Sequence, residues 1–383
     1  MTDSGKPPFR ADHVGSLLRP QSLIDARRRL LGYDNDKAAP PLMGGHENAE
    51  LRALEDECIR DAVTLQEDLG LKGVTDGEYR RTFFHLDFLE QFDGVEVTTG
   101  IPAKFQGGSK KVEFAPPKMV VSGKLERPQG IATDDFAYLK SLTRNTAKLC
   151  IPSPTMLHFR GGRKAVDEGA YPDMADFFTD LARVYAEEIA ALGELGCTYL
   201  QLDDTNLAYL CDPAIQESTR QLGEDPATLP RQYAKLINEA ISSRPKDMAI
   251  TIHLCRGNFK SAWVAEGGYE PVAEVLFNEL DVDGYFLEYD DERSGDFAPL
   301  RFVPKGKRVV LGLVSSKLAA LESKDEIKAR IDEAAKYMPL DQMALSPQCG
   351  FSSTVHGNDL SVEEEKAKIR LIVETADDVW GTA

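Results

Sequence analysis

Short apolar segments alternate with longer amphipathic segments along most of this 383-residue chain. This alternation constrains the fold strongly, because parallel strands joined by crossover helices produce it. Strands are expected at residues 11–16, 73–76, 155–159, 199–203, 249–255, 284–289, 308–314 and 343–346. Helices are expected at residues 48–69, 174–195, 229–243, 262–278, 324–337 and 362–379. Eight strand–helix units predict an α/β fold, a (β/α)8 TIM barrel in which residues 1–383 form a single domain, with a two-domain doubly wound arrangement as the alternative.

The second unit contains an unusually long connection, because the next strand of the barrel after the one at residues 73–76 is expected only at 155–159. Within an insertion at about residues 84–128, a β-hairpin is expected from strands at 94–99 and at 111–114 continuing at 119–123. Loops of that length in compact domains usually have a function. The insertion therefore predicts either a lid or a subunit contact in a homo-oligomer.

Charge and composition exclude several classes of partner. The net charge of −18 argues against a nucleic-acid partner, because no basic surface is available to neutralise phosphates. The chain contains no signal-peptide pattern and no apolar run of about 18 residues, so neither export nor a membrane span is expected. Six scattered cysteines do not resemble a disulfide scaffold and favour a reduced, cytoplasmic setting.

Polar side chains follow the expected strands at the point where each strand ends. His253 and Cys255 share one side of a strand, because side chains alternate along it, and they can therefore reach one ion. Glu288 and Cys349 stand in equivalent places at two later strand ends. One imidazole, one carboxylate and two thiolates suit four-coordinate Zn²⁺ better than Mg²⁺ or Ca²⁺. These four residues are therefore predicted metal ligands.

The remaining cysteines and histidines receive plainer interpretations. Buried cysteines usually act as small hydrophobic residues, which is the expectation for Cys58, Cys150, Cys197 and Cys211. His46 and His85 are expected to be surface residues in loops.

A zinc ion with these ligands suggests thiol chemistry. Such a site carries about one net negative charge, so it is a weak Lewis acid for hydrolysis but can hold a further thiolate. Binding to the metal would deprotonate a substrate thiol near neutral pH, whereas a free thiol keeps its proton to about pH 8.5. Glu78 and Asp203 could bind the ammonium group of an amino-acid thiol, and Gly15 and Ser16 could bind its carboxylate.

Taken together, these motifs resemble the C-terminal catalytic barrel of the cobalamin-independent methionine synthases over almost the whole chain. The metal motifs are His253-Leu254-Cys255, Glu288 and Pro347-Gln348-Cys349-Gly350, and the substrate motifs are Val14-Gly15-Ser16, Gly77-Glu78 and Gln201-Leu202-Asp203. The resemblance implies that Val14, Gly15, Ser16, Glu78 and Asp203 hold homocysteine, that Asp203 also serves catalysis, and that methyl transfer produces methionine. The methyl donor would be 5-methyltetrahydrofolate.

The chain departs from the family pattern in two places. It is too short to contain the second, N-terminal barrel of the full-length enzymes, and it has Val314-Ser315-Ser316-Lys317 where the family has a catalytic His. His356, in the loop at 351–358, is predicted to replace that His as the acid, with His158 as the alternative. Two other functions stay open: zinc-dependent alkyl transfer to another small thiol of the coenzyme M type, from a corrinoid protein or an epoxide, and a zinc-stabilised barrel without catalysis.

Overall fold

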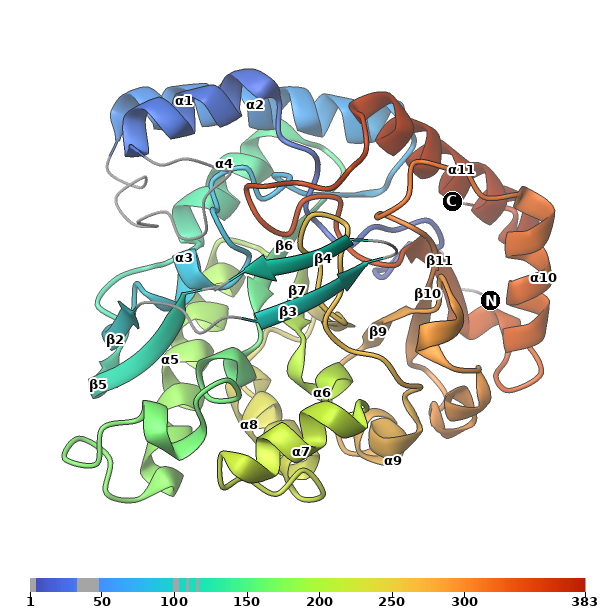
Figure 1. The fold of residues 1–383 in the computed structure, drawn as a ribbon. Helices are drawn as coiled ribbons and strands as arrows, with labels where there is room; N and C mark the ends of the chain where they lie inside the picture. Colours follow the sequence, from blue (N-terminus) through green and yellow to red (C-terminus); the bar gives the residue numbers. More distant parts are fainter. Residues whose placement is uncertain (1–4, 33–47, 99–102, 108–109, 115–116, 383) are drawn as a thin grey trace.

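The computed structural model describes residues 5–32, 48–98, 103–107, 110–114 and 117–382. Its centre is a curled sheet of seven parallel strands in the order β1-β6-β7-β8-β9-β10-β11, surrounded by helices (Figure 1). These strands are β1 (Gly73–Val74), β6 (Thr146–Pro152), β7 (Tyr199–Asp204), β8 (Ala249–Leu254), β9 (Gly284–Glu288), β10 (Arg308–Val314) and β11 (Met343–Pro347). The α/β class is confirmed, and the carboxyl ends of the strands meet on one side of the sheet.

The segment predicted as the first strand forms only one bridge in the described structure. Ala11 pairs in parallel with Leu345, next to the hydrogen bond from the Asp12 N–H to the Leu345 carbonyl. On the other side, the Thr75 hydroxyl donates to the Gly15 carbonyl at 2.6 Å. The segment thus lies between the edge strands β11 and β1. Gly15, with φ of 137°, interrupts the extended backbone, so the eighth strand of the predicted closed barrel is not formed there.

The third predicted strand, at residues 155–159, is wrong. Residues Pro154–Leu157 form a 3₁₀ helix, and the strand lies earlier, at Thr146–Pro152. This strand was not predicted because the charged residue Lys148 lies within it and interrupts the run of apolar residues. In the structure its ammonium group is fully buried and lies 3.0 Å from the Asp12 carboxylate.

Most of the predicted helices are confirmed, with ends that shift by a few residues. The long helices are α2 (Ala49–Asp68), α5 (Met174–Glu194), α8 (Leu229–Ile241) and α11 (Val362–Trp380). The shorter ones are α1 (Gln21–Leu31), α3 (Leu86–Leu89), α4 (Thr133–Leu142), α6 (Asn206–Tyr209), α7 (Pro213–Gln221), α9 (Glu270–Asn278) and α10 (Lys324–Ala334). α9 begins later than residue 262, because Lys260 and Ser261 have positive φ values and Phe259 pairs with Ala262 in a tight turn.

Two antiparallel pairs lie between β1 and β6 in the sequence. β2 (Asp93–Thr98) pairs with β5 (Lys118–Glu126), and β3 (Ala103–Gly107) pairs with β4 (Lys110–Phe114). The β3–β4 pair crosses in front of the central strands in Figure 1. Residues 99–102, 108–109 and 115–116 of the predicted insertion fall outside the described residues. Its role as a lid or a subunit contact stays a prediction.

None of the helices within the described ranges combines the length and the apolar content that crossing a lipid bilayer requires.

Candidate metal and substrate site

Four side chains able to bind a metal converge at the carboxyl ends of three strands. His253 lies in β8, Cys255 follows it directly, Glu288 ends β9 and Cys349 follows β11. One ligand atom from each residue lies within 4.8 Å of those from the other three, and all four residues are buried. Parallel strands bring their carboxyl ends to one edge, so residues far apart in sequence meet there.

The two cysteines of this cluster are in contact. Their sulfur atoms lie 3.4 Å apart, and the Gly257 N–H donates to the Cys255 sulfur at 3.3 Å. Their mutual hydrogen bond holds the pKa of Cys349 well below its usual value and raises that of Cys255. Burial alone would lower the pKa of His253, but the adjacent Cys349 sulfur, with Asp203 and Glu288, raises it. Cys349 therefore becomes a thiolate more readily than an ordinary cysteine does, and Cys255 less readily.

Glu288 is ionised in spite of its burial. Its carboxylate accepts from the Arg256 backbone N–H at 3.0 Å and from Arg293 Nη2 at 3.4 Å. Burial alone would raise its pKa, but the cations Lys317, Arg293 and Arg256 lower it to about 2. Lys317, three residues after the end of β10, is buried, and its ammonium group has no hydrogen-bond partner in the described part of the chain.

The cluster fits a resident metal ion. His253 is 2% exposed, and neither of its ring nitrogens has a hydrogen-bond partner among the described residues. A buried imidazole without partners is unfavourable, and a metal bound to one nitrogen would remove part of that penalty. One nitrogen, one carboxylate oxygen and two sulfur atoms form a donor set that thiolate-binding metals accept.

A second cluster lies beside the first. Ligand-type atoms of Glu78, Cys150 and Asp203 also lie within 4.8 Å of one another. Burial raises the pKa of Glu78 to about 8 and that of Asp203 to about 6, although Arg81 lies 3.7 Å from Glu78 and Gln201 donates to Asp203 at 2.7 Å. Two adjacent buried carboxyl groups repel each other when both are ionised. The pair is therefore most stable when a cation lies next to both groups or when one of them keeps its proton.

Gly15 is needed at its position for steric reasons. A Cβ atom there would lie 2.6 Å from the Cys150 sulfur and 3.0 Å from Glu78 Oε1, and φ is 137°. The backbone of residues 14–16 therefore packs directly against the carboxylate cluster. Cys150, expected to be inert, donates from its thiol to the Val14 carbonyl at 3.2 Å and so supports this backbone. Cys58, Cys197 and Cys211 are buried and free, as expected.

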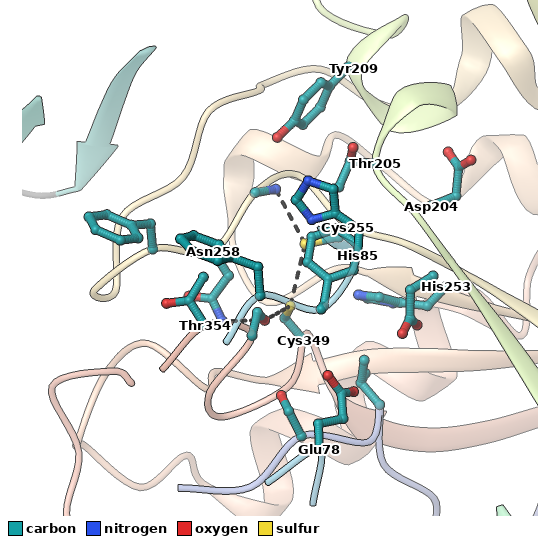
Figure 2. Close-up of a pocket in the computed structure, with 18 of the residues that line it drawn as sticks. Glu78, His85, Asp204, Thr205, Tyr209, His253, Cys255, Asn258, Cys349 and Thr354 are labelled. Carbon is teal, nitrogen blue, oxygen red and sulfur yellow. Dashed lines mark hydrogen bonds between the residues drawn. The ribbon is translucent and has the colours of Figure 1, made fainter. Parts of the chain in front are cut away.

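Both clusters open on one cavity of about 660 Å³, a volume that includes space open to solvent. The predicted residues that line it are Val14, Ser16, Glu78, Asp203, His253, Cys255 and Cys349. Figure 2 shows the two sulfur atoms at the centre, with His253 to one side and Glu78 below. Gly15 is between the lining residues Val14 and Ser16 in the sequence. Glu288 does not line the cavity and is hydrogen-bonded to the Arg256 backbone and to Arg293.

The histidines depart from expectation. His85, expected at the surface, is 2% exposed and lines the cavity, and its position seven residues after Glu78 in the same long loop was the available signal. His46 lies outside the described residues. His356 does not line the cavity: its ring packs against Phe259 and Phe83 with centroids 4.9 and 6.2 Å away, and burial lowers its pKa to about 4.

His158, the alternative acid, occupies a structural position. Its Nδ1 lies 2.9 Å from the Tyr233 hydroxyl and its Nε2 lies 3.5 Å from Glu224. Both nitrogens are thus engaged away from the cavity lining.

Comparison with known proteins agrees with this arrangement. The model of the cobalamin-independent synthase catalytic domain matches residues 42–378. The uncharacterized protein YxjH of Bacillus subtilis is 48% identical over 379 residues, covering 98% of this chain and 96% of that protein. The structure of a Listeria monocytogenes protein assigned to the vitamin-B12-independent methionine synthases superposes with a TM-score of 0.76 at 40% identity, covering 98% of this chain and 99% of that one.

A more distant relative carries the name of an enzyme. The 5-methyltetrahydropteroyltriglutamate–homocysteine methyltransferase of Bacillus licheniformis is 25% identical over 320 residues, which make up 83% of this chain but only 37% of that enzyme. From the family model and these relatives, the chain belongs to the family of the cobalamin-independent methionine synthase catalytic domain.

Proposed function

We propose that this protein is a zinc-dependent methyltransferase that methylates the thiol of homocysteine to form methionine, with 5-methyltetrahydrofolate as the methyl donor. The observation that carries the proposal is the position of two clusters on one cavity: a thiolate-rich ligand set and a pair of carboxyl groups. An amino-acid thiol offers a group for each. Its sulfur suits the first cluster, and its ammonium group suits the second.

His253, Cys255, Glu288 and Cys349 would hold the zinc ion. When bound, zinc would supply a site at which a substrate thiol loses its proton near neutral pH. The chain itself contributes the charge balance. Lys317, Arg293 and Arg256 offset the negative charge of Glu288 and the cysteines, so that this buried ligand set can form.

Glu78 and Asp203 would bind the substrate ammonium group. Both are buried, and burial raises their pKa values even though Arg81 lies near Glu78, so a further cation between the two carboxylates would stabilise their ionised forms. The backbone of Val14, Gly15 and Ser16 would bind the substrate carboxylate, since it packs against Glu78. Asp203, near both clusters, would also orient the substrate during transfer. We keep residues 1–383 as one catalytic domain in this proposal.

The donor half of the reaction is supported by the name of the Bacillus licheniformis relative, of which the chain spans 37%. His356 is proposed as the acid that protonates the leaving pterin nitrogen. This role requires a path from the loop at 351–358 into the cavity, whose wall includes Thr354, at 3.2 Å from His356 Nδ1.

The experiment is a donor panel. Zinc-loaded protein is incubated with homocysteine and, in separate reactions, with monoglutamyl methyltetrahydrofolate, polyglutamyl methyltetrahydrofolate and a methylated corrinoid, and methionine is quantified by mass spectrometry. Turnover with a folate that is lost in Cys349→Ser supports the proposal. Methionine from the corrinoid alone would replace the folate as donor. No methionine from any donor would refute methyl transfer to homocysteine.

A further inference from the structure

We propose that Arg160 and His85 form a binding subsite for an anionic group of the second substrate, on the wall of the same cavity. That the second substrate is a methyl donor rests on the proposed function; that the subsite binds an anion does not. Both side chains line the cavity that contains the metal-ligand set and the carboxyl pair.

His85 is a buried polar side chain without a partner. It is 2% exposed, and neither Nδ1 nor Nε2 makes a hydrogen bond with any described residue. Its nearest ring neighbour is Phe84, with centroids 4.5 Å apart, which offers no hydrogen-bonding atom. In the view of Figure 2 the imidazole lies between the Tyr209 hydroxyl and the sulfur of Cys255. A buried imidazole in this condition needs a hydrogen-bond partner, and because His85 lines the cavity, a molecule bound in the cavity can supply one.

Arg160 is a half-buried cation on the same wall. The structure assigns it neither an ion pair nor a hydrogen bond within the described ranges. Three other arginines around the site are all engaged: Arg81 with Glu78, Arg256 with the Tyr269 hydroxyl, and Arg293 with Glu288 and Asp290. In a chain with a net charge of −18, a cavity-lining guanidinium without an acidic partner is unusual.

The two residues also act on each other. Burial, and then the charge of Arg160, hold the pKa of His85 well below its usual value, so the ring is neutral and offers one N–H donor and one acceptor. A guanidinium and a neutral N–H donor on the lining of one cavity match the oxygen atoms of a carboxylate, a phosphate or a sulfonate.

This charge pattern divides the cavity into two parts. Glu78 and Asp203 favour an ammonium group, whereas the charge of Arg160 favours an anion and opposes a cation, and neutral His85 can add an N–H donor for the anion. The second substrate is therefore predicted to be an anionic methyl donor, such as one with carboxylate groups, and not a sulfonium or quaternary ammonium compound.

Binding to the full-length, zinc-loaded protein tests the subsite without turnover. Isothermal titration calorimetry would measure monoglutamyl methyltetrahydrofolate as a carboxylate probe, inorganic phosphate as a second anion and trimethylsulfonium as a cation. Arg160→Gln should weaken the folate by roughly tenfold or more, since a charge-assisted contact is lost. Arg160→Lys should retain part of the affinity. Arg144→Gln, which removes one exposed arginine outside the cavity lining, is the matched control.

His85→Phe should weaken the same anions severalfold, whereas His85→Gln, which keeps a donor, should weaken them less. Phosphate should compete with the folate in the wild-type protein and lose that ability in Arg160→Gln. Equal anion affinities for Arg160→Gln and Arg144→Gln, or binding of neither anion to the wild-type protein, would overturn the subsite.

Methionine binding to each variant serves as an internal check, because the amino-acid part of the cavity should be unaffected. Arg160-dependent anion binding in a protein that forms no methionine would leave the subsite standing and refute the proposed function. Methionine formation by a protein whose anion binding does not depend on Arg160 would refute the subsite and leave the proposed function standing.

Discussion

The sulfur atoms of Cys255 and Cys349 lie 3.4 Å apart, although the two residues are separated by 94 positions in the sequence. Two thiolates on one tetrahedral zinc ion, each at about 2.3 Å from the metal, would lie roughly 3.8 Å apart. The protein thus holds both sulfur atoms close to the spacing that a shared ion requires. The register of β8, β9, β10 and β11 produces this approach, because these strands are parallel neighbours in one sheet.

The first prediction concerns this pair. The wild-type protein is predicted to bind about one zinc ion per chain, and Cys255→Ser and Cys349→Ser should each lose it, because a hydroxyl is a poor substitute for a thiolate ligand. Folding should survive, since the site lies at the strand ends and not within the apolar core. Elemental analysis and circular dichroism measure the two properties. Cys58→Ser, at a buried cysteine on α2, is the control and should keep its metal; full zinc retention in both ligand variants would show that the assignment is wrong.

The clustering of His253, Cys255, Glu288 and Cys349 could be predicted from sequence because each residue lies at or just after the end of a strand with a plain apolar pattern, whereas their role as metal ligands stays a prediction. Parallel strands bring their carboxyl ends to one edge of the sheet, so residues at those ends lie together whatever their separation in the sequence. β6 was missed because Lys148 breaks the pattern, and its partner Asp12 is far away in the sequence. His85 was missed because its nearness to Glu78 in the sequence does not reveal the long-range pairing of Phe83 with Thr354, which folds the loop after β1 back over the cavity.

The second prediction concerns Lys148, the buried charged residue that interrupts the apolar pattern of β6. Lys148→Met should destabilise the protein by about 3–5 kcal/mol, because Asp12 would remain buried without its cation. The Tyr199 hydroxyl, which donates to Asp12 at 2.7 Å, would compensate only in part. Urea denaturation measures the free energy of unfolding. Lys124→Met, at an exposed lysine, should change little, and the double variant Asp12→Asn/Lys148→Met should recover part of the loss. A single Lys148→Met variant as stable as the wild type would contradict the prediction.

The third prediction concerns the recognition of the ammonium group. Glu78→Gln and Asp203→Asn should weaken homocysteine by about 3 kcal/mol, or roughly 100-fold, since a buried ion pair loses one partner. The same variants should bind 4-mercaptobutanoate, which lacks only the ammonium group, nearly as the wild type does. Titration of the zinc-loaded protein with both thiols measures the difference. Equal losses for the two thiols would assign these carboxylates a structural role and favour a thiol of the coenzyme M type.

The fourth prediction follows from the raised pKa values. At pH 7 Glu78, with a pKa of about 8, keeps its proton in the free protein, and a bound ammonium group would lower that pKa and release the proton. Binding of methionine, which has no thiol to deprotonate, should therefore release protons near pH 7. The release should shrink above about pH 8, where the free carboxyl is already ionised.

Calorimetry in buffers of different ionisation enthalpy counts these protons. Glu78→Gln should lower the number, and 4-(methylthio)butanoate, which lacks only the ammonium group, should release none. Methionine binding without any dependence on the buffer would refute the proposed cation site.

The last prediction concerns the acid. Phe83 and Phe259 pack against the His356 ring, so His356 can serve a donor in the cavity only through Thr354 or after a local shift of these rings. If it protonates the folate, His356→Ala should lower folate-dependent methionine formation by about 100-fold or more, the usual contribution of a general acid. Zinc content and homocysteine binding should be unchanged. Because the pKa of His356 lies near 4, the wild-type rate should rise as the pH is lowered from 7, and this rise should vanish in the variant. His158→Ala, which removes contacts with Tyr233 and Glu224, should lower stability and leave the pH profile intact. A His356→Ala protein with the full rate and the same pH profile would mean that the proton comes from a different group.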